Sequence, residues 1–270
     1  MAAINKIPVV ILAGGLGTRL GEETIKIPKP MVMIGEKPMI WHIMNIYSHF
    51  GLRSFIICLG YKGEIIKKYF YHYAILNSDI KISIGKKNTV SYFNKGDMGD
   101  IQVILANTGL NSFTGSRLKK VQKYIKSDNF MVTYGDGVAN INIAKLLRFH
   151  IQHGKIATVT GIKPPTRFGD LVINGSQVKE FTEKPKTEGG YVNGGYFVFN
   201  RAIFEYLSED EGCILEKEPL EKLARDGQLM VFKHDDFWRC VDTPRELALL
   251  NDLWKNDKAQ WKVWKYGRYE

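Results

Sequence analysis

Short apolar segments alternate along the chain with segments of helical periodicity, and this alternation restricts the fold most. Pro8–Ala13 is apolar throughout and rich in Val and Ile, as expected for a strand buried on both faces of a parallel sheet. Met39–Phe50 then repeats its apolar residues on one helical face, and Gly51 follows as a helix stop. Repeated strand–helix units predict an α/β fold with a doubly wound, mostly parallel, Rossmann-like sheet.

The same pattern extends towards the end of the chain. The remaining expected strands are Ser54–Leu59, Asp79–Ile84, Ile101–Ala106, Phe130–Tyr134, Lys155–Thr160, Leu171–Ile173, Val178–Phe181 and Tyr191–Phe199. The remaining expected helices are Gly63–Tyr73, Ser116–Lys126, Ile141–His153, Ala202–Leu207, Glu216–Arg225 and Pro244–Trp254. Asp79–Ile84 alternates Ile with polar residues, which predicts a half-exposed strand. Because the pattern becomes mixed after Pro165, we expect one domain over residues 1–270, with lobes at about 1–160 and 161–270.

The composition is that of an ordinary globular protein. Hydrophobic residues make up 44% and charged residues 24% of the 270 positions, which excludes wholesale disorder, a collagen-like fibre and a disulfide-stapled miniprotein. The 38 Lys and Arg residues outnumber the 28 Asp and Glu residues, so the formal net charge is +10. This excess favours an anionic partner, namely phosphate, nucleotide, nucleic acid or an acidic membrane surface, without choosing among them.

The cysteines and the hydropathy of the sequence indicate in which cellular compartment we expect the protein. Cys58, Cys213 and Cys240 are far apart and form no C-x-x-C pair, so we expect no zinc site, no disulfide framework and a cytoplasmic protein. No apolar run approaches the roughly 18 residues that a membrane-spanning helix needs, and we expect no membrane partner. The run Ile7–Ala13 is at the lower length limit for a signal-peptide core and continues into glycines, so a buried first strand is the better interpretation.

A glycine-rich turn, G-G-L-G-T-R-L at residues 14–20, directly follows the first expected strand. At the carboxyl end of a parallel strand, glycines let backbone N–H groups approach a phosphate, and Arg19 adds a cation that can bind in bidentate fashion. The dinucleotide fingerprint G-x-G-x-x-G and the G-K-[ST] ending of the P-loop are both absent from this turn. Lys29, which Pro28 and Pro30 should keep out of a helix, is a second candidate phosphate contact.

This turn, followed by P-K-P at residues 28–30, resembles the signature of the sugar-nucleotidyltransferase family, whose members make NDP-sugars from NTPs and sugar 1-phosphates. The resemblance runs nearly end to end and is strongest to the glucose-1-phosphate cytidylyltransferase branch. Segments that carry it include Gly35–Met44, Phe113–Lys119, Tyr134–Val138, Glu183–Lys186, Val192–Val198 and the closing Lys258–Trp264. Ile27 departs from the family pattern, because members of that branch often read K-P-K-P.

The resemblance implies a reaction of CTP with α-D-glucose 1-phosphate that gives CDP-glucose and pyrophosphate, commonly for deoxysugar synthesis. It implies catalytic roles for Arg19 and Lys29. It implies a nucleotide site formed by Leu12, Gly14, Gly15, Gly17, Thr18, Arg19, Lys29, Thr108, Ser112 and Arg117. It implies sugar-phosphate contacts from Gly169, Glu183, Lys184, Asn193 and Gly194.

Two acidic residues follow expected strands at distant points of the chain. Asp136 lies in Y-G-D-G after Phe130–Tyr134, and Asp242 precedes the last expected helix. Two carboxylates could share one Mg²⁺, which prefers carboxylate, water and phosphate oxygens and would offset the charge of a triphosphate. The residues alone leave Asp136 open as a turn residue and Asp242 as a helix N-cap. The family resemblance implies that both acids hold Mg²⁺.

Several alternatives stay open at this stage. The same chemistry could use another NTP, dTTP or UTP, or another phosphorylated acceptor. A nucleic-acid-binding protein would use the basic segment Arg117–Lys126 and the Trp and Lys residues of Trp254–Arg268, although no standard nucleic-acid motif is present. A non-catalytic relative is disfavoured because the basic and acidic residues of the pattern are all present. Loops at residues 20–38 and 84–100 are candidate lids or subunit contacts of a homo-oligomer.

Overall fold

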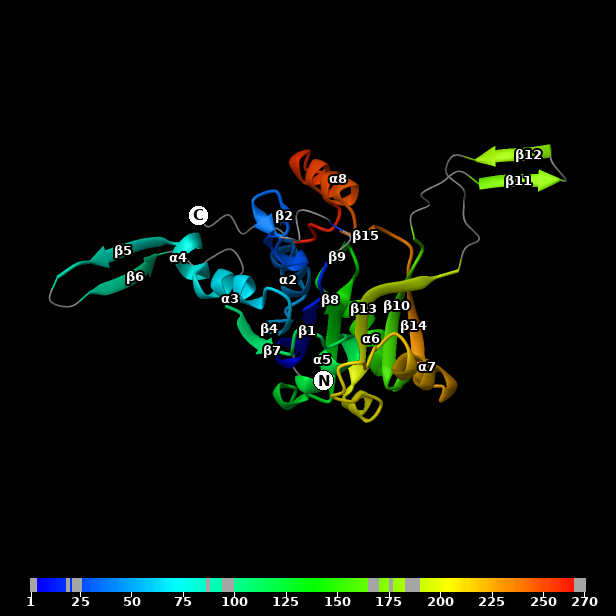
Figure 1. The fold of residues 1–270 in the computed structure, drawn as a ribbon, viewed down its shortest axis with the longest axis horizontal. Coiled ribbons are helices and arrows are strands. Elements are labelled where there is room, and N and C mark those ends of the chain that lie inside the picture. Colours follow the sequence, from blue (N-terminus) through cyan, green and yellow to red (C-terminus); the bar gives the residue numbers. More distant parts are fainter. Residues whose placement is uncertain are drawn as a thin grey trace.

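A seven-stranded sheet forms the centre of the computed structural model (Figure 1), which describes residues 4–17, 20, 26–85, 88–93, 100–164, 170–174, 177–182 and 190–264. Its strands are, in spatial order, β14 (Leu229–His234), β10 (Ala157–Ile162), β13 (Val192–Asn200), β8 (Asn129–Tyr134), β1 (Pro8–Ala13), β4 (Ser54–Leu59) and β7 (Gln102–Asn107). β13 is antiparallel to both of its neighbours, and the other four strand pairs are parallel. The expected mostly parallel α/β sheet is confirmed.

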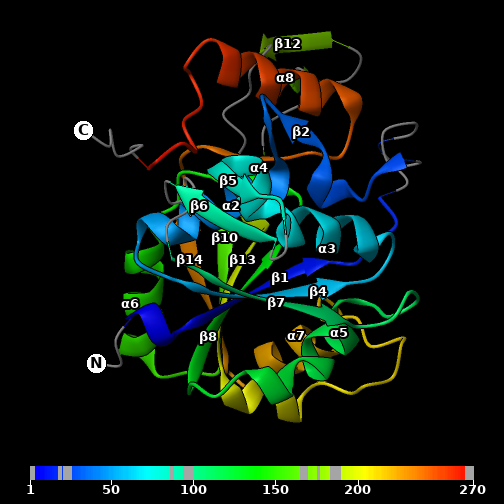
Figure 2. The same ribbon diagram turned by 90° about the vertical axis from the view of Figure 1, so that its left-hand side faces the viewer.

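β1 lies within this sheet and is buried on both faces. Because side chains alternate along a strand, Val9 and Ile11 enter one hydrophobic core and Val10 and Leu12 the other. The helices contributing to the first core are α2 (Met39–His49), α3 (Gly63–Tyr71), α6 (Ile143–His153) and α8 (Pro244–Lys255). Those contributing to the second are α5 (Thr114–Lys120) and α7 (Glu218–Arg225). The sheet is therefore the middle of three layers (Figure 2).

Short elements complete the described part of the chain. They are η1 (Ile4–Lys6), η3 (Lys29–Met31), η4 (Gln122–Tyr124), η5 (Arg201–Glu205) and α4 (Tyr73–Asn77). Four antiparallel pairs join β2 (Met33–Ile34) to β3 (Lys37–Pro38), β5 (Asp79–Ser83) to β6 (Thr89–Phe93), β9 (Gly137–Ala139) to β15 (Trp238–Cys240), and β11 (Asp170–Asn174) to β12 (Gln177–Thr182). Across the described ranges, every helix is too short or too polar to cross a membrane.

α2 is buried all round, whereas its sequence predicted one apolar face. Every residue from Met39 to Ser48 is buried. The sheet covers one side, where Tyr47 stacks on Tyr196 of β13 at a ring-centroid distance of 6.1 Å. On the other side, a cluster of rings from Trp254, Trp261 and Trp264 packs against the helix. Trp261 and Trp264 are thus core residues, which removes them as the base-stacking surface that a nucleic-acid-binding protein would need.

His42 of α2 is held within this aromatic cluster. Burial lowers its pKa to about 4, so the ring is neutral near pH 7. Its Nε2 lies 3.0 Å from the carbonyl oxygen of Ile34, and Trp261 Nε1 donates to its Nδ1 at 3.3 Å. A neutral ring that donates from Nε2 and accepts at Nδ1 satisfies both contacts. This bond joins α2 to a residue near the end of the described chain.

The β5–β6 hairpin differs from its prediction in exposure. Every residue of both strands is exposed, although the alternation in Asp79–Ile84 predicted one buried face. The hairpin extends from the body of the molecule (Figure 1), so no core reaches either face of it. β6 lies inside the segment that was expected to be a loop, and β2 and β3 likewise lie inside the other expected long loop.

Two further local predictions were wrong. Pro28 and Pro30 were expected to keep Lys29 out of any helix, yet Lys29–Met31 is a 3-10 turn with Pro30 in its first turn. Proline fits there because its missing N–H has no partner to lose. The basic helix ends at Lys120 rather than Lys126, because the chain turns through η4 and buries Val121 and Ile125 in the second core.

Candidate active site

Two cavities lie side by side where the carboxyl ends of β1 and β8 meet the start of β13. The larger has a volume of about 890 Å³ and the smaller about 220 Å³. The larger cavity is lined by residues 12–17, Lys29, Pro30, residues 110–114, Arg117 and Tyr134–Asp136. The smaller is lined by Thr133, Tyr134, Asp136, Gly137, Asn193–Tyr196, Trp238, Cys240 and Asp242. Tyr134 and Asp136 line both, so they mark the boundary between the two.

The turn after β1 is held by Arg117 of α5. Arg117 is 4% exposed, and both of its terminal nitrogens donate within the chain. Nη1 donates to Leu59 O (3.1 Å), Thr108 Oγ1 (2.8 Å) and Gly109 O (2.7 Å), and Nη2 donates to Gly14 O (2.9 Å) and Leu110 O (3.1 Å). A Cβ on Gly14 would lie 2.2 Å from the guanidinium, so a larger residue there would displace Arg117 from its hydrogen bonds. The arrangement makes Arg117 a clamp on the cavity wall rather than a side chain that projects into the cavity.

Thr108 and Ser112, both expected at the nucleotide, are buried supports of the same wall. Thr108 Oγ1 donates to Leu59 O at 2.8 Å, and Ser112 Oγ donates to Thr108 O at 2.6 Å. Lys120 Nζ donates to Ser112 Oγ at 2.8 Å. These bonds fold residues 108–112 into a compact loop over the larger cavity, where Ser112 and the neighbouring loop residues form part of the lining.

Lys29, Asp136 and Asp242 converge at the boundary between the cavities. Lys29 Nζ lies 2.5 Å from Asp136 Oδ2 and 2.6 Å from Asp242 Oδ1. Burial lowers the pKa of Lys29, but attraction to Asp136 and the hydrogen bonds that Lys29 donates to both carboxylates outweigh burial, and the net pKa is raised. The ammonium group therefore stays charged at neutral pH beside two carboxylates.

The fold explains why two acids so far apart in the sequence meet. Asp136 follows β8 in a turn, and β9 then pairs with β15, which opposes Gly137 to Cys240. Val241 N donates to Asp136 O at 2.8 Å, so Asp242 arrives beside Asp136. The alternative of Asp242 as an N-cap was wrong, because Thr243 caps α8 in a capping box with Glu246.

Asn193 and Gly194 begin β13 beside the smaller cavity. Asn193 Oδ1 accepts from Gly195 N at 2.8 Å, and Asn193 Nδ2 donates to Tyr134 Oη at 3.0 Å. A Cβ on Gly194 would lie 2.7 Å from the Ile162 side chain, so packing alone requires glycine there. Its carbonyl accepts from Trp238 Nε1 at 2.7 Å. Asn193 is thus the more direct candidate for contact with a ligand.

Three polar residues that the sequence did not single out join this site. Tyr134 Oη donates to Glu216 Oε1 at 2.5 Å, and Thr114 Oγ1 donates to Glu216 Oε2 at 2.5 Å. Tyr134 shares its motif with Asp136, so its place in the motif was a usable signal. Glu216 precedes α7 and has no local sequence signal, because its partners come from other parts of the chain.

Comparison with known proteins decides the family. The sequence profile described as "Nucleotidyl transferase" matches residues 8–253. The chain belongs to the nucleotidyl transferase family. This nucleotidyl transferase is 48% identical over 256 residues to a glucose-1-phosphate cytidylyltransferase of Salmonella typhimurium, an alignment covering 94% of this chain and 98% of that one. It is 41% identical over 255 residues to a probable glucose-1-phosphate cytidylyltransferase of Bacillus subtilis, covering 94% and 99%.

Solved structures agree on the fold of the nucleotidyl transferase. A putative glucose-1-phosphate thymidylyltransferase from Bacillus anthracis, in complex with a sucrose, matches with a TM-score of 0.67 and 18% identity. The match covers 97% of this chain and 98% of that chain. At this identity the likeness supports the fold alone, and the expected α/β architecture agrees with it.

Five expected site residues of the nucleotidyl transferase fall outside the described residues. They are Thr18, Arg19, Gly169, Glu183 and Lys184. The described ones that line the two cavities are Leu12, Gly14, Gly15, Gly17, Lys29, Ser112, Arg117, Asp136, Asn193, Gly194 and Asp242. Residues expected to contact nucleotide thus line mainly the larger cavity, and Asn193 and Gly194 line the smaller.

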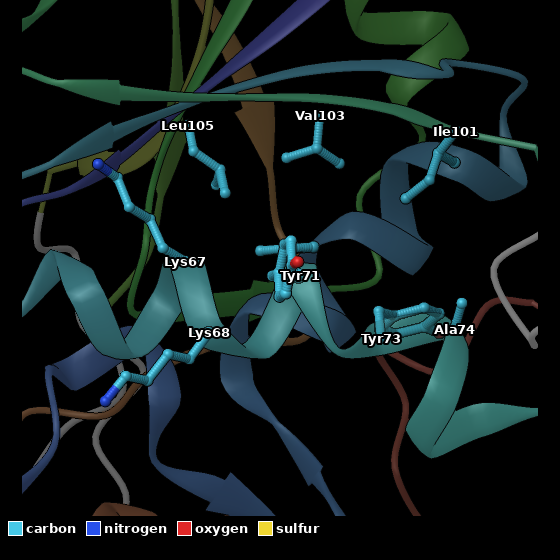
Figure 3. A pocket seen from close by; sticks show the side chains of 9 residues that line it. Lys67, Lys68, Tyr71, Tyr73, Ala74, Ile101, Val103 and Leu105 are labelled. Atoms are coloured by element: carbon cyan, nitrogen blue, oxygen red, sulfur yellow. The ribbon is translucent and has the colours of Figure 1, made fainter. Parts of the chain in front are cut away.

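A third cavity of about 750 Å³ is different in character. Figure 3 shows side chains of α3 and α4 facing Val103 and Leu105, which point from β7 toward these helices. Its lining is mainly apolar, and Lys67 and Lys68 are the charged residues among its described lining residues. None of these described lining residues is an acid, so they offer no counterpart to the Asp136 and Asp242 pair.

Proposed function

We propose that this nucleotidyl transferase joins CTP to α-D-glucose 1-phosphate, giving CDP-glucose and pyrophosphate. The observation that carries the proposal is the cluster of Lys29, Asp136 and Asp242 at the junction of the two cavities. The identity of 48% to a glucose-1-phosphate cytidylyltransferase over nearly the whole of both chains supports the choice of substrates. A nucleotide in the larger cavity and a sugar phosphate in the smaller would meet at this cluster.

The carboxylates of Asp136 and Asp242 are suited to Mg²⁺. Both are hard oxygen donors, and both already lie within 2.6 Å of a cationic group, Lys29 Nζ. Within the described ranges, no group of three or more His, Cys, Asp or Glu side chains could hold a metal. Mg²⁺ commonly takes one or two carboxylates and completes its shell with water and phosphate oxygens, so the donor set fits. When bound, Mg²⁺ would offset negative charge on the phosphates.

The reaction is an in-line displacement at phosphorus. A phosphate oxygen of the sugar phosphate attacks the α-phosphorus of CTP, the new P–O bond forms, and the bond to pyrophosphate breaks. No proton has to leave the attacking oxygen when the sugar phosphate is a dianion. Catalysis then rests on holding the reactants in line and stabilising the charge that develops.

The chain's own residues divide this work. The backbone of residues 14–17 lines the larger cavity beside the triphosphate position. Among the described residues, Lys29 places its ammonium group at the junction, and we assign it to stabilising the transferring nucleotidyl group. Asn193 orients the acceptor. Thr18, Arg19, Gly169, Glu183 and Lys184 keep their proposed contacts to nucleotide and sugar phosphate.

The subunit organisation belongs to the same proposal. The two lobes act as one domain, since the seven-stranded sheet takes strands from both. We also propose that the chain forms a homo-oligomer through the β5–β6 hairpin, whose exposed large side chains include Ile82, Val90, Tyr92 and Phe93. A lone two-stranded hairpin is marginal in water, and a second copy would bury these side chains.

Pyrophosphate release tests the proposed reaction. Purified protein is given Mg²⁺ and each pair from CTP, UTP, dTTP, ATP and GTP with glucose 1-phosphate and other sugar 1-phosphates. We expect release with CTP and glucose 1-phosphate, and CDP-glucose by mass spectrometry. Release with dTTP, UTP or another acceptor would preserve the chemistry and overturn the substrate assignment. Folded protein that releases none would overturn the proposal.

The matched control exchanges a lysine outside the site. Lys29→Met should abolish turnover without unfolding the protein, whereas Lys163→Met removes an exposed lysine paired with Asp235 and should leave turnover unchanged. Equal activity in both variants would remove Lys29 from the catalytic role.

A further inference from the structure

A continuous line of hydrogen bonds crosses the boundary between the two cavities. It runs from Thr114 at the start of α5 to Glu216, then to Tyr134 at the end of β8, and ends at Asn193 of β13. The three bonds are 2.5, 2.5 and 3.0 Å long. Thr114 lines the larger cavity and Asn193 the smaller, so the line joins the two walls.

The direction of each bond follows from the donors and acceptors available. Burial, and then the negative charge of Glu216, raise the pKa of Tyr134, so its phenol stays neutral. Its single proton goes to Glu216 Oε1, while Glu216 Oε2 accepts the hydroxyl proton of Thr114. Tyr134 Oη is therefore left as an acceptor, and of the two ends of the Asn193 amide it is Nδ2 that can donate to it.

This direction fixes the orientation of the Asn193 amide. Nδ2 faces Tyr134, and Oδ1 accepts from Gly195 N at 2.8 Å. One N–H and one lone pair of the amide are left over for a ligand in the smaller cavity. With the opposite orientation, Oδ1 would face an oxygen that has no proton to give. The line of hydrogen bonds from Thr114 to Asn193 thus determines which hydrogen-bonding groups Asn193 presents to a ligand in the smaller cavity.

The Tyr134 ring is held in place by its surroundings. Gly195 has a φ of +78°, and a Cβ there would lie 2.5 Å from the ring. Phe197 packs edge-on against the ring at a centroid distance of 5.7 Å. Glycine at 195 lets the backbone of β13 pass close to the ring, so that Asn193 can reach Tyr134 Oη.

We propose that Tyr134 and Glu216 are positioning residues that orient Asn193 for the phosphorylated sugar acceptor and anchor that orientation to the start of α5. The inference rests on the proposed function, because it assigns the smaller cavity to the acceptor. Neither residue transfers a group or a proton to substrate. Their effect is on how well the acceptor is bound and aligned, with little effect on binding of the nucleotide.

Tyr134→Phe tests this directly, because it removes only the hydroxyl. We expect the KM for glucose 1-phosphate to rise about tenfold while the KM for CTP stays within twofold of wild type. Glu216→Ala should have a similar effect. Glu216→Gln keeps an oxygen that can accept from Tyr134 and should restore most of the acceptor KM. Tyr206→Phe, which removes an exposed tyrosine bond to Asp226, is the matched control and should change neither KM.

A double-mutant cycle separates positioning from general destabilisation. If Tyr134 acts through Asn193, then Tyr134→Phe should add little to the acceptor KM of Asn193→Ala. Independent, additive effects would overturn the inference. So would equal increases in both KM values, or an unchanged acceptor KM in a folded Tyr134→Phe protein.

Binding of glucose 1-phosphate by calorimetry provides a readout that does not depend on turnover. We expect weaker binding by the Tyr134→Phe and Glu216→Ala proteins and wild-type binding by Tyr206→Phe. If the wild-type protein forms no CDP-glucose, the proposed function is wrong. If the wild-type protein is active but the effects of Tyr134→Phe and Asn193→Ala on the acceptor KM are additive, only the inference about Tyr134 and Glu216 is wrong.

Discussion

Arg117→Ala should destabilise the fold first and affect nucleotide binding only through the cavity wall. Three bonds from the guanidinium, to Leu59 O, Thr108 Oγ1 and Gly14 O, are buried. Hydrogen bonds to a charged group contribute about 1.5–3 kcal/mol each. Two of these acceptors keep another donor, since Leu59 O also accepts from Thr108 N and Gly14 O from Tyr61 N, which reduces the loss.

The net cost of the change is therefore about 3–4 kcal/mol, a large share of a typical free energy of unfolding of 5–15 kcal/mol. For a chain of this size, each kcal/mol lowers Tm by roughly 2–4 °C, so we expect a fall of about 10 °C. Thermal unfolding followed by circular dichroism, without ligand, measures it. Arg117→Lys should lose less, because an ammonium group has three donors but lacks the fork of the guanidinium.

The control is Arg201→Ala, because Arg201 makes one part-buried bond to Ile125 O, at 2.7 Å, away from both cavities. It should lower Tm by no more than about 3 °C. The result that would refute the assignment of Arg117 as a clamp is an Arg117→Ala protein that has the Tm of wild type and only a raised KM for CTP. Arg117 would then be a direct triphosphate contact, as the family resemblance implied.

Three further outcomes are expected. The pKa of Lys29 is raised above 10.5 in the folded state, so the stability that its charge contributes is fully present below pH 10.5 and is lost only as the pH rises through the raised pKa. Lys29→Met should therefore leave the pH dependence of the free energy of unfolding unchanged between pH 6 and 9. A new pH-dependent transition in that range would contradict this prediction. Asp242→Asn should raise the Mg²⁺ concentration for half-maximal activity at least tenfold, in a Mg²⁺ titration after removal of metal with EDTA, and an unchanged titration would exclude Asp242 as a ligand. Ile82→Lys should shift the particle mass measured by light scattering toward that of the monomer. Lys81→Glu, a charge change on the same strand, should not. If Ile82→Lys leaves the mass unchanged, the β5–β6 hairpin does not form the subunit contact.

Sequence patterns predicted those strands and turns whose conformation depends on neighbouring residues along the chain. Pro8–Ala13 was readable as a strand because a run of apolar β-branched residues suits burial on both faces. The turn that follows was readable from its glycines, which were expected to let backbone N–H groups approach a phosphate. At Gly14 the structure adds a steric reason that the sequence did not show, because a Cβ there would lie 2.2 Å from the Arg117 guanidinium. Lys29, Asp136 and Asp242 were candidates from their residue types and their places after expected strands, and the family resemblance assigned their roles; the structure brings all three together.

What the sequence missed depends on contacts between distant segments. The periodicity of α2 could not show that Trp261 and Trp264 cover its outer side. Nothing near Glu216 indicates that Tyr134 and Thr114 lie against it. The role of Arg117 was open for the same reason, because its acceptors come from several separate segments of the chain.

The convergence of Lys29, Asp136 and Asp242 bears on the order in which the protein becomes competent during synthesis. A growing chain carries Lys29 early and Asp136 near its middle, but Asp242 only after β15 has paired with β9. β13, which supplies Asn193, also inserts between β8 and β10 only after both strands have been made. An incomplete chain thus lacks part of the proposed cation site and part of the proposed acceptor wall. If those assignments hold, a chain truncated before Asp242 should release no pyrophosphate.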